Sequence, residues 1–283
     1  MLRSPKTKGS GLSFDHISLA KKGSTLALEV PPGSTVAIMG PAASGKTTIL
    51  EAIAGTARVE RGDITRPEAG FSLSSADWSR RDSAMSTARE ILGKNSAQKA
   101  TDAISALGLW EVRQKAYLSL SPSQQAAAIF IPALLKEPKL LCSDHDFDHL
   151  DWSTLQNLWQ VLSDMRQRGM ILAFTTHRPD LGEWADFVLV LKGEQVVFSG
   201  TPESLKRTVV ETTLEVATDN RPGAKAIADP FEVSIEETPE GLRMATKEGQ
   251  ALAAKLLLEG YGDVKFLVQK PPTFAEAFLK LIG

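Results

Sequence analysis

A glycine-rich loop between two apolar segments has the residue types and spacing that bind the phosphates of a nucleoside triphosphate. The loop reads GPAASGKT from Gly40 to Thr47 and fits the pattern G-x-x-x-x-G-K-[ST]. Its glycines let successive backbone N–H groups turn toward phosphate oxygens, and the helix that begins near Lys46 adds its positive N-terminal end. Lys46 is expected to reach the β- and γ-phosphates, and the Thr47 hydroxyl to hold Mg²⁺. The predicted ligand is ATP with Mg²⁺, and its predicted contacts are Gly40, Pro41, Ala42, Ala43, Ser44, Gly45, Lys46, Thr47 and Thr48.

A second group with related chemistry ends an apolar run farther along the chain. Residues 140–143 are Leu-Leu-Cys-Ser, and Asp144 follows them. A carboxylate at the end of a buried strand can ligate Mg²⁺ or accept a hydrogen bond from water bound to the ion. An Asp at a strand end is more often a turn or cap residue when it stands alone. Because it accompanies a phosphate loop, Asp144 is predicted to be a metal ligand.

Alternating strands and helices must position these residues. Short apolar runs predict buried strands over 35–39, 139–143 and 171–175, and a helix is predicted over 46–55. Further strands are expected over 12–19, 25–30, 187–191 and 195–199, the last two as a hairpin. Helical spacing is found over 87–92, 97–107, 123–135 and 153–167, and Pro132 is expected to interrupt the third of these segments. The alternation predicts an α/β fold with a mostly parallel sheet and helices around it.

The pattern changes after about residue 205. Strands are predicted over 212–216, 231–235, 242–246 and 264–268, and helices over 248–258 and 273–281. The predicted organisation is a flexible tail over 1–11, a main domain over 12–205 with a helical part at about 75–135, and a small α+β domain over 206–283.

Composition excludes several classes of protein. The formal net charge of the 283 residues is −2 and no long basic run occurs, so a nucleic-acid binder is not expected. The single cysteine, Cys142, excludes a disulfide framework and is interpreted as a buried thiol. No apolar stretch is long enough to span a bilayer, and no hydrophobic segment of signal-peptide length follows the basic N-terminus. We therefore expect a cytoplasmic protein that meets a membrane only through a partner.

The segment from Leu120 to Asp151 resembles the signature, Walker-B and D-loop block of the ATP-binding subunits of ABC transporters, without a gap. The sequence LSPSQ, from Leu120 to Gln124, lies where the family has LSGGQ. Asp144 lies at the Walker-B Asp, Asp151 at the D-loop Asp and His177 at the switch histidine. The C-terminal part, which ends in FAEAFLKLIG, is similar to the small C-terminal domain of bacterial drug- and polysaccharide-exporter subunits.

This resemblance implies a P-loop NTPase core of the ABC type, with a mostly parallel sheet, an antiparallel β part and a helical subdomain. It also implies that two ATP-binding subunits, identical or different, dimerise head to tail on the cytoplasmic face of the inner membrane. Each ATP then lies between the phosphate loop of one subunit and the signature of the other, and closure drives an integral-membrane permease. On this basis Ser121, Ser123 and Gln124 are predicted to contact ATP, and Asp151 and His177 to take part in hydrolysis.

The sequence departs from the family at the catalytic positions. Where the family has a Glu that polarises the attacking water, this chain has His145. A neutral imidazole can accept a hydrogen bond but carries no negative charge. His145 is therefore either a weaker catalytic group or a polar residue without a catalytic role. In the signature, Pro122 and Ser123 replace two glycines, which removes one backbone N–H and adds side chains beside the phosphates.

Other departures concern the metal and the base. The family's Mg²⁺-contacting Gln is replaced by Ser74, whose shorter side chain would act only through water. The aromatic residue that stacks on adenine should lie near Ala20 or Lys21, and neither is aromatic. His149 is interpreted as a residue of the dimer surface or of the solvent-exposed surface. A metal site formed by His149 with His145 and Asp146 is the less favoured interpretation.

Three functions are consistent with these features. The first is an ABC transporter subunit that binds MgATP and hydrolyses it slowly. The alternative is an ATP-dependent structural or regulatory scaffold of the same fold. A small-molecule kinase fits less well, because the chain lacks an evident acceptor-site base and lid arginines.

Overall fold

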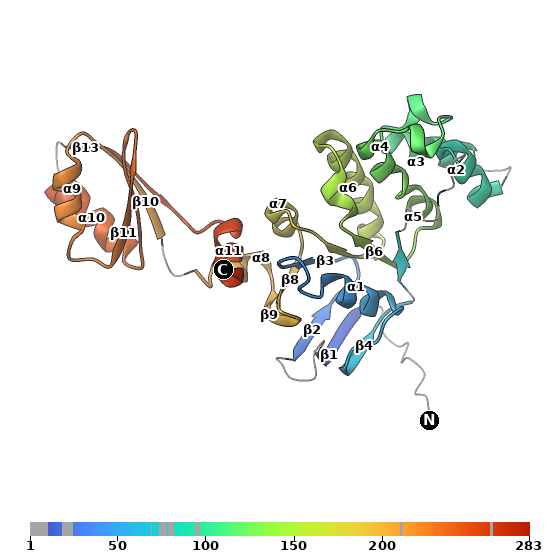
Figure 1. The fold of residues 1–283 in the computed structure, drawn as a ribbon, viewed down its shortest axis with the longest axis horizontal. Coiled ribbons are helices and arrows are strands. Elements are labelled where there is room, and N and C mark those ends of the chain that lie inside the picture. Colours follow the sequence, from blue (N-terminus) through green and yellow to red (C-terminus); the bar gives the residue numbers. More distant parts are fainter. Residues whose placement is uncertain are drawn as a thin grey trace. The chain divides into compact units, whose positions relative to one another are not determined.

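The computed structural model describes residues 11–18, 25–68, 70–73, 78, 82–93, 97–209, 212–260 and 263–283. The described chain divides at Pro202 into two compact units (Figure 1). Among the described residues, no helix has the length and apolar character needed to cross a membrane.

A six-stranded sheet forms the centre of the first unit. Its strand order is β5-β6-β7-β3-β8-β9, and every neighbouring pair is parallel except β8 and β9, which form an antiparallel hairpin. The strands are β3 (Thr35–Met39), β5 (Phe71–Ser72), β6 (Leu140–Asp144), β7 (Ile171–Thr175), β8 (Phe187–Lys192) and β9 (Gln195–Gly200). The predicted apolar strands and the predicted hairpin are confirmed. β3 and β7 are fully buried, as the apolar runs that form them require.

A three-stranded antiparallel sheet accompanies the central one. Its order is β2-β1-β4, with β1 (Leu12–Ser18), β2 (Leu26–Val30) and β4 (Arg61–Thr65). β4 was not predicted from the sequence, because its residues RGDIT have no apolar alternation and none of its side chains is buried. One hydrophobic core joins residues of both sheets with the inner face of α1 (Lys46–Ala54).

Helices complete the first unit. After α1 they are α2 (Ala84–Leu92), α3 (Ala97–Ala106), α4 (Pro122–Ala128), α5 (Ile131–Lys136), α6 (Trp152–Gln167) and α7 (Pro179–Glu183), with short 3₁₀ turns η3 (Trp110–Val112), η4 (Tyr117–Ser119) and η5 (Asp146–His149). The next helix, α8 (Pro202–Lys206), begins at the boundary, and its remaining residues belong to the second unit. The segment over 123–135 forms two helices, α4 and α5, as the predicted interruption by Pro132 requires. Pro132 lies in the first turn of α5, where its missing N–H is tolerated, and a continuous helix would lose a hydrogen bond there.

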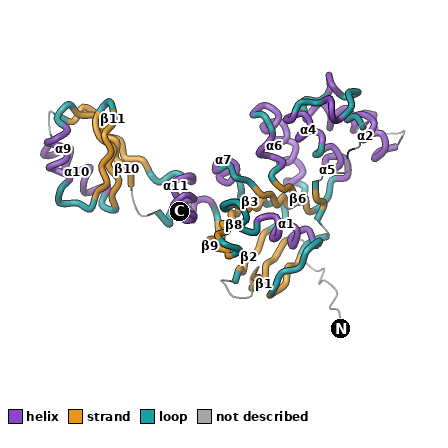
Figure 2. Tube along the Cα trace, viewed as in Figure 1, coloured by secondary structure: helices purple, strands orange, loops and turns teal. Residues whose placement is uncertain are grey.

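The second unit is an α+β fold (Figure 2). Its antiparallel sheet has the order β11-β12-β10-β13, built from β10 (Thr212–Thr218), β11 (Val233–Thr238), β12 (Gly241–Thr246) and β13 (Val264–Lys270). The helices are α9 (Arg221–Ala228), α10 (Gly249–Glu259) and α11 (Phe274–Ile282). Buried side chains of the sheet, α9 and α10 form a core of their own, with Leu214, Leu242 and Leu256 among its members. α9 was not predicted from the sequence; Asn220 caps its first turn, which contains Pro222.

Candidate nucleotide-binding site

The loop between β3 and α1 has the backbone conformation of a phosphate cradle. Gly40 and Gly45 have φ angles of 148° and 92°, and Ala43 also has a positive φ of 57°. A Cβ atom on Gly40 would lie 2.2 Å from the carbonyl oxygen of Leu191. The close approach of β8 therefore leaves room only for glycine at this position.

Lys46 places its ammonium inside this loop. The side chain is 5 % exposed, and Nζ donates hydrogen bonds to the carbonyl oxygens of Gly40 (3.0 Å) and Pro41 (2.7 Å). Burial lowers the pKa of Lys46, while the carboxylates of Asp144 and Asp148 act in the opposite direction. A buried cation at the start of a helix favours an anionic ligand such as a phosphate.

The ends of β6 and β7 meet the first turn of α1. The Thr47 hydroxyl donates to Oδ2 of Asp144 at 2.9 Å, and the Thr175 hydroxyl donates to Oδ1 of the same carboxylate at 2.6 Å. Parallel strands place their carboxyl ends at one edge of the sheet, which is where ligands bind in open α/β folds. A hydroxyl and a carboxylate are the hard oxygen donors that Mg²⁺ prefers, so Thr47 and Asp144 fit this ion.

Ser44 supplies an independent test of whether the loop fits a phosphate. Its side chain is 2 % exposed, and its Oγ has no hydrogen-bond partner among the described residues. A buried hydroxyl without a partner is destabilising unless a ligand or water satisfies it. A phosphate oxygen in the loop would be a suitable partner.

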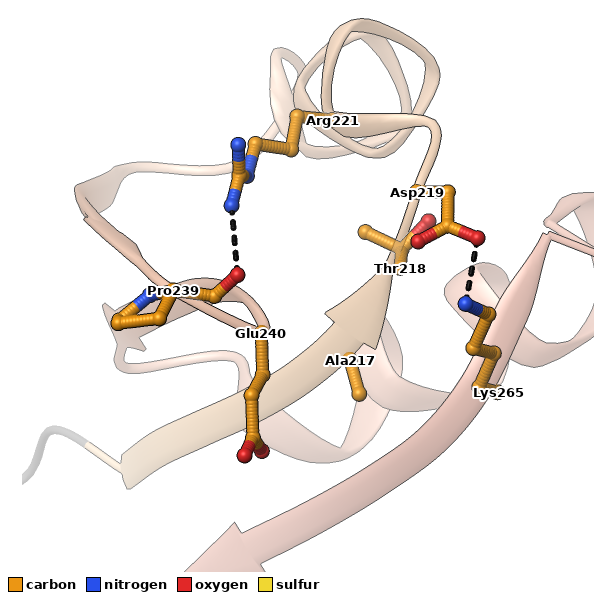
Figure 3. Close-up of a pocket in the computed structure, with 7 residues that line it drawn as sticks. All are labelled: Ala217, Thr218, Asp219, Arg221, Pro239, Glu240 and Lys265. Atoms are coloured by element: carbon orange, nitrogen blue, oxygen red, sulfur yellow. Dashed lines mark hydrogen bonds and ion pairs between the residues drawn. The ribbon is translucent and has the colours of Figure 1, made fainter.

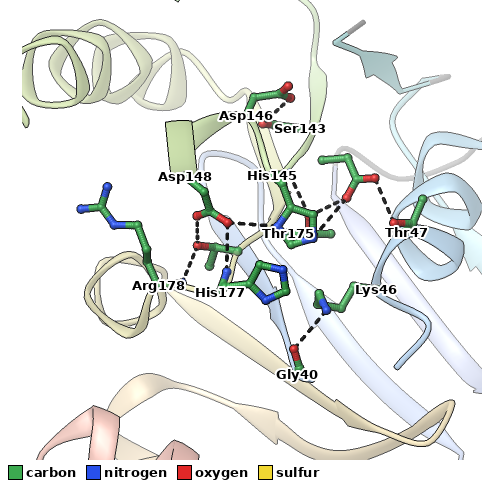
Figure 4. A network of polar contacts seen from close by, with 12 residues as sticks. Gly40, Lys46, Thr47, Ser143, His145, Asp146, Asp148, Thr175, His177 and Arg178 are labelled. Atoms are coloured by element: carbon green, nitrogen blue, oxygen red, sulfur yellow. Dashed lines mark hydrogen bonds and ion pairs between the residues drawn. The ribbon is translucent and has the colours of Figure 1, made fainter. Parts of the chain in front are cut away.

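His145 has well-defined neighbours beyond Asp144. Its backbone N–H donates to the Thr175 hydroxyl at 2.9 Å, and its Nδ1 lies 3.0 Å from Oδ2 of Asp148 (Figure 4). Its ring stacks on that of His177, with centroids 4.3 Å apart and an interplanar angle of 13°. Burial lowers the pKa of His177, and the neighbouring His145 ring and Lys46 ammonium act in the same direction.

Asp148 and Thr175 were not singled out by the sequence analysis. The available signal was weak, since Asp148 is one of two acidic residues in η5 and Thr175 simply ends an apolar strand. The turn of η5 places Asp148 three residues after His145 and on the same side. Among the described residues, no group of three or more His, Cys, Asp or Glu side chains is arranged to hold a metal.

The signature residues form a second cluster. The Ser121 hydroxyl accepts from the Gln124 N–H (3.3 Å), and the Gln124 side chain accepts from the Ser121 N–H (3.0 Å), so the two form a capping box at α4. The Ser123 hydroxyl donates to Oδ2 of Asp151 at 2.6 Å and accepts from the Asp151 N–H at 3.0 Å. Asp151 also caps α6, and these hydrogen bonds lower the pKa of its carboxyl. No hydrogen bond among the described residues joins this cluster to the phosphate loop.

Several predicted positions lie outside the described residues. They are Ser74, predicted to contact Mg²⁺ through water, and Ala20 and Lys21, near the expected place of an adenine-stacking residue. Trp78, a few residues after Ser74, lies within the described part of the chain. Its side chain is 9 % exposed and stacks on the ring of Tyr117, with ring centroids 5.0 Å apart.

A separate pocket lies in the second unit and contains none of the predicted site residues. Its volume is about 420 Å³, and Figure 3 shows Asp219, Arg221, Glu240 and Lys265 on its walls. Both cations are already engaged, because Lys265 pairs with Asp219 and Arg221 donates to the carbonyl oxygens of Thr238 and Pro239.

Known proteins with similar sequences are ATP-binding proteins of ABC transporters. Residues 24–147 match the family profile described as ABC transporter. The aliphatic sulfonates import ATP-binding protein SsuB 2 of Rhodococcus jostii is 32% identical over an alignment that covers 61% of this chain and 73% of the relative. The Fe(3+) ions import ATP-binding protein FbpC 2 of the same organism is 27% identical, with 89% of this chain and 77% of the relative covered.

Solved structures show the same fold. The dimeric structure of a post-hydrolysis state of an ATP-binding cassette, bound to ADP and Pi, superposes with a TM-score of 0.57 at 18% identity, and covers 67% of this chain and 98% of that one. An identity this low supports the fold alone. The sequence relationship to SsuB 2 extends over most of that protein, and the family profile matched by residues 24–147 includes the phosphate loop. The chain therefore belongs to the family of ABC transporter ATP-binding subunits.

Proposed function

We propose that this subunit binds MgATP through residues 40–48 and Asp144 and hydrolyses it slowly. The observation that carries the proposal is the 2.9 Å hydrogen bond from Thr47 to Asp144, which joins the phosphate loop to the end of β6. The buried Lys46 ammonium supports phosphate binding at the same loop, and so does the Ser44 hydroxyl, which has no hydrogen-bond partner in the part of the chain that the structure describes.

Slow hydrolysis follows from the residues beside this intact loop. His145 stands where the family has a Glu, and general bases contribute about 10²–10⁴-fold to rates. Pro122 provides no N–H at the start of α4, and loss of one donor to a developing charge lowers rates by about 10²–10³-fold in other enzymes. Since one site of a dimer combines the loop of one subunit with the signature of the other, this chain would slow both sites.

We further propose that the subunit works as a head-to-tail dimer, with itself or with a second ATP-binding subunit, on an integral-membrane permease. The dimeric cassette of the same fold and the import proteins among the relatives support this arrangement. The site of action would then be the cytoplasmic face of the inner membrane.

Two measurements on the purified chain test the first proposal. Calorimetric titration is expected to detect binding of MgATP, and steady-state phosphate release is expected to be at least about 10²-fold slower than that of a subunit with Glu after its Walker-B Asp. His145→Glu should raise the rate. A rate equal to that of regular subunits, unaffected by His145→Ala, would contradict slow hydrolysis.

Co-purification from cells tests the partnership. Recovery of a polytopic membrane protein with the tagged chain supports the transporter role. Recovery of soluble partners alone would instead favour the ATP-dependent scaffold.

A further inference from the structure

We propose that His145 is the general base for the residual ATP hydrolysis of this subunit, and that Asp148 is the positioning residue that makes it one. This inference rests on the proposed function, because it concerns the same site. It assigns a role to Asp148, whose carboxylate faces the imidazole at 3.0 Å.

The contact between Asp148 and His145 determines where the imidazole carries its hydrogen. A carboxylate only accepts hydrogen bonds, so the ring nitrogen that faces it must be a donor. The atom 3.0 Å from Oδ2 of Asp148 is Nδ1, and the neutral ring therefore keeps its lone pair on Nε2. This is the arrangement in which a carboxylate orients a catalytic histidine in hydrolases.

Asp148 is itself held in place by groups from the end of β7. Its carboxylate accepts hydrogen bonds from the Thr176 hydroxyl and, at 3.1 Å, from the backbone N–H of His177. Its side chain is 13 % exposed. A carboxylate with three donors and little contact with water has one preferred orientation, so it can fix the ring that it contacts.

The imidazole is fixed from its other sides as well. His145 has a φ of 62°, and its backbone N–H is bonded to the same Thr175 hydroxyl that donates to Asp144. Stacking on His177 restricts rotation of the ring. Nε2 lies 3.9 Å from Oδ1 of Asp144, which is too far for a direct hydrogen bond, and the side chain is 25 % exposed, so water can reach it.

Hydrolysis by this route needs no reactant other than ATP and water. Nε2 of His145 takes one proton from the attacking water, while the water oxygen forms a bond to the γ-phosphorus of ATP. The bond from the γ-phosphorus to the β,γ-bridging oxygen breaks, and its electron pair leaves with ADP. The imidazolium, stabilised by Asp148, then returns its proton to phosphate or solvent.

The decisive experiment is a double-mutant cycle measured by phosphate release from the full chain. Asp148→Asn is expected to lower kcat at least about tenfold, and His145→Ala about 10²-fold or more, with the Kd for MgATP changed less than about twofold. In a His145→Glu background, Asp148→Asn should not lower kcat, because the glutamate needs no orienting carboxylate. An equal loss in both backgrounds would overturn the proposal and show that Asp148 only supports the loop before His177. Asp164→Asn, an exposed change on α6, is the matched control and should leave kcat unchanged.

A spectroscopic measurement on the nucleotide-free protein tests the same contact. Long-range ¹H–¹⁵N correlation at pH 8 distinguishes the two tautomers of each of the four histidines, and His145→Gln assigns the signal. In the unmodified protein we expect the ring hydrogen of His145 on Nδ1. In the Asp148→Asn variant we expect it on Nε2, or in exchange between the two ring nitrogens. A hydrogen on Nε2 in the unmodified protein would contradict the proposal. Failure of MgATP to bind would instead contradict the proposed function, so the two can be told apart.

Discussion

The Thr47 hydroxyl donates a 2.9 Å hydrogen bond to Asp144, a residue 97 positions later in the chain. The contact joins the helix after the phosphate loop to the end of β6. The two oxygens lie within hydrogen-bond distance, so a single cation could contact both without large movement of the backbone.

Thr47→Val should therefore weaken nucleotide binding only when Mg²⁺ is present. Loss of one metal ligand is expected to raise the Kd for MgATP about tenfold, or ~1.4 kcal/mol, and to leave the Kd in EDTA unchanged. Titration with a fluorescent ATP analogue, with and without Mg²⁺, measures both values. Thr56→Val makes the same chemical change at an exposed position after α1 and serves as the control. Equal weakening with and without Mg²⁺ would show that Thr47 is not a metal ligand.

Gly40→Ala should distort the phosphate loop, because the new Cβ atom would meet the carbonyl oxygen of Leu191 at 2.2 Å. We expect urea unfolding to show a loss of stability of about 1–3 kcal/mol. We also expect the Kd for MgATP to rise at least about tenfold, because one contact with the phosphates would be lost. Gly193→Ala is a matched control, since its φ of 56° is also positive and nothing lies within 4 Å of the added atom. Equal effects of the two substitutions would contradict the steric explanation.

Asp146→Asn should stabilise the protein in a pH-dependent manner. Burial raises the pKa of Asp146 from 3.8 to about 6, against the hydrogen bond that Ser143 donates at 2.9 Å. Between pH 3.8 and about pH 6, Asp146 keeps its proton in the folded protein but has lost it in the unfolded chain. The contribution of Asp146 to the free energy of unfolding therefore falls as pH rises from about 4 to 6 and stays low at higher pH.

Asp146→Asn removes the cost of burying an ionised carboxylate, which is at most about 3 kcal/mol in the free energy of unfolding. Urea unfolding in EDTA should show the variant more stable than the parent at pH 7.5, by about 1–3 kcal/mol, with a smaller difference at pH 4.5. A difference that does not change with pH would mean that Asp146 is not the titrating group.

Cys142 should be unreactive in the folded protein. It is 1 % exposed in β6, and burial raises the pKa of its thiol to about 12, so the thiolate is scarce at pH 8. Ellman's reagent is expected to detect no thiol in native protein and one per chain in urea. Rapid reaction of the native protein would show that β6 opens locally.

The sequence by itself determined the phosphate loop, the apolar strands that flank it and the position of Asp144, because these depend on local chemistry and on runs of apolar residues. It also determined the family, through ungapped motifs. The roles of the individual site residues, and the likeness of residues 206–283 to exporter subunits, stay predictions.

The tertiary structure decided what local patterns do not encode. β4 has no apolar alternation and pairs with β1 only because the chain returns to it. The contacts of Asp148 with His145 and of Ser123 with Asp151 depend on how turns bring side chains together. Hydrogen bonds act over about 3 Å, and the spacing of residues along a chain does not specify distances on that scale.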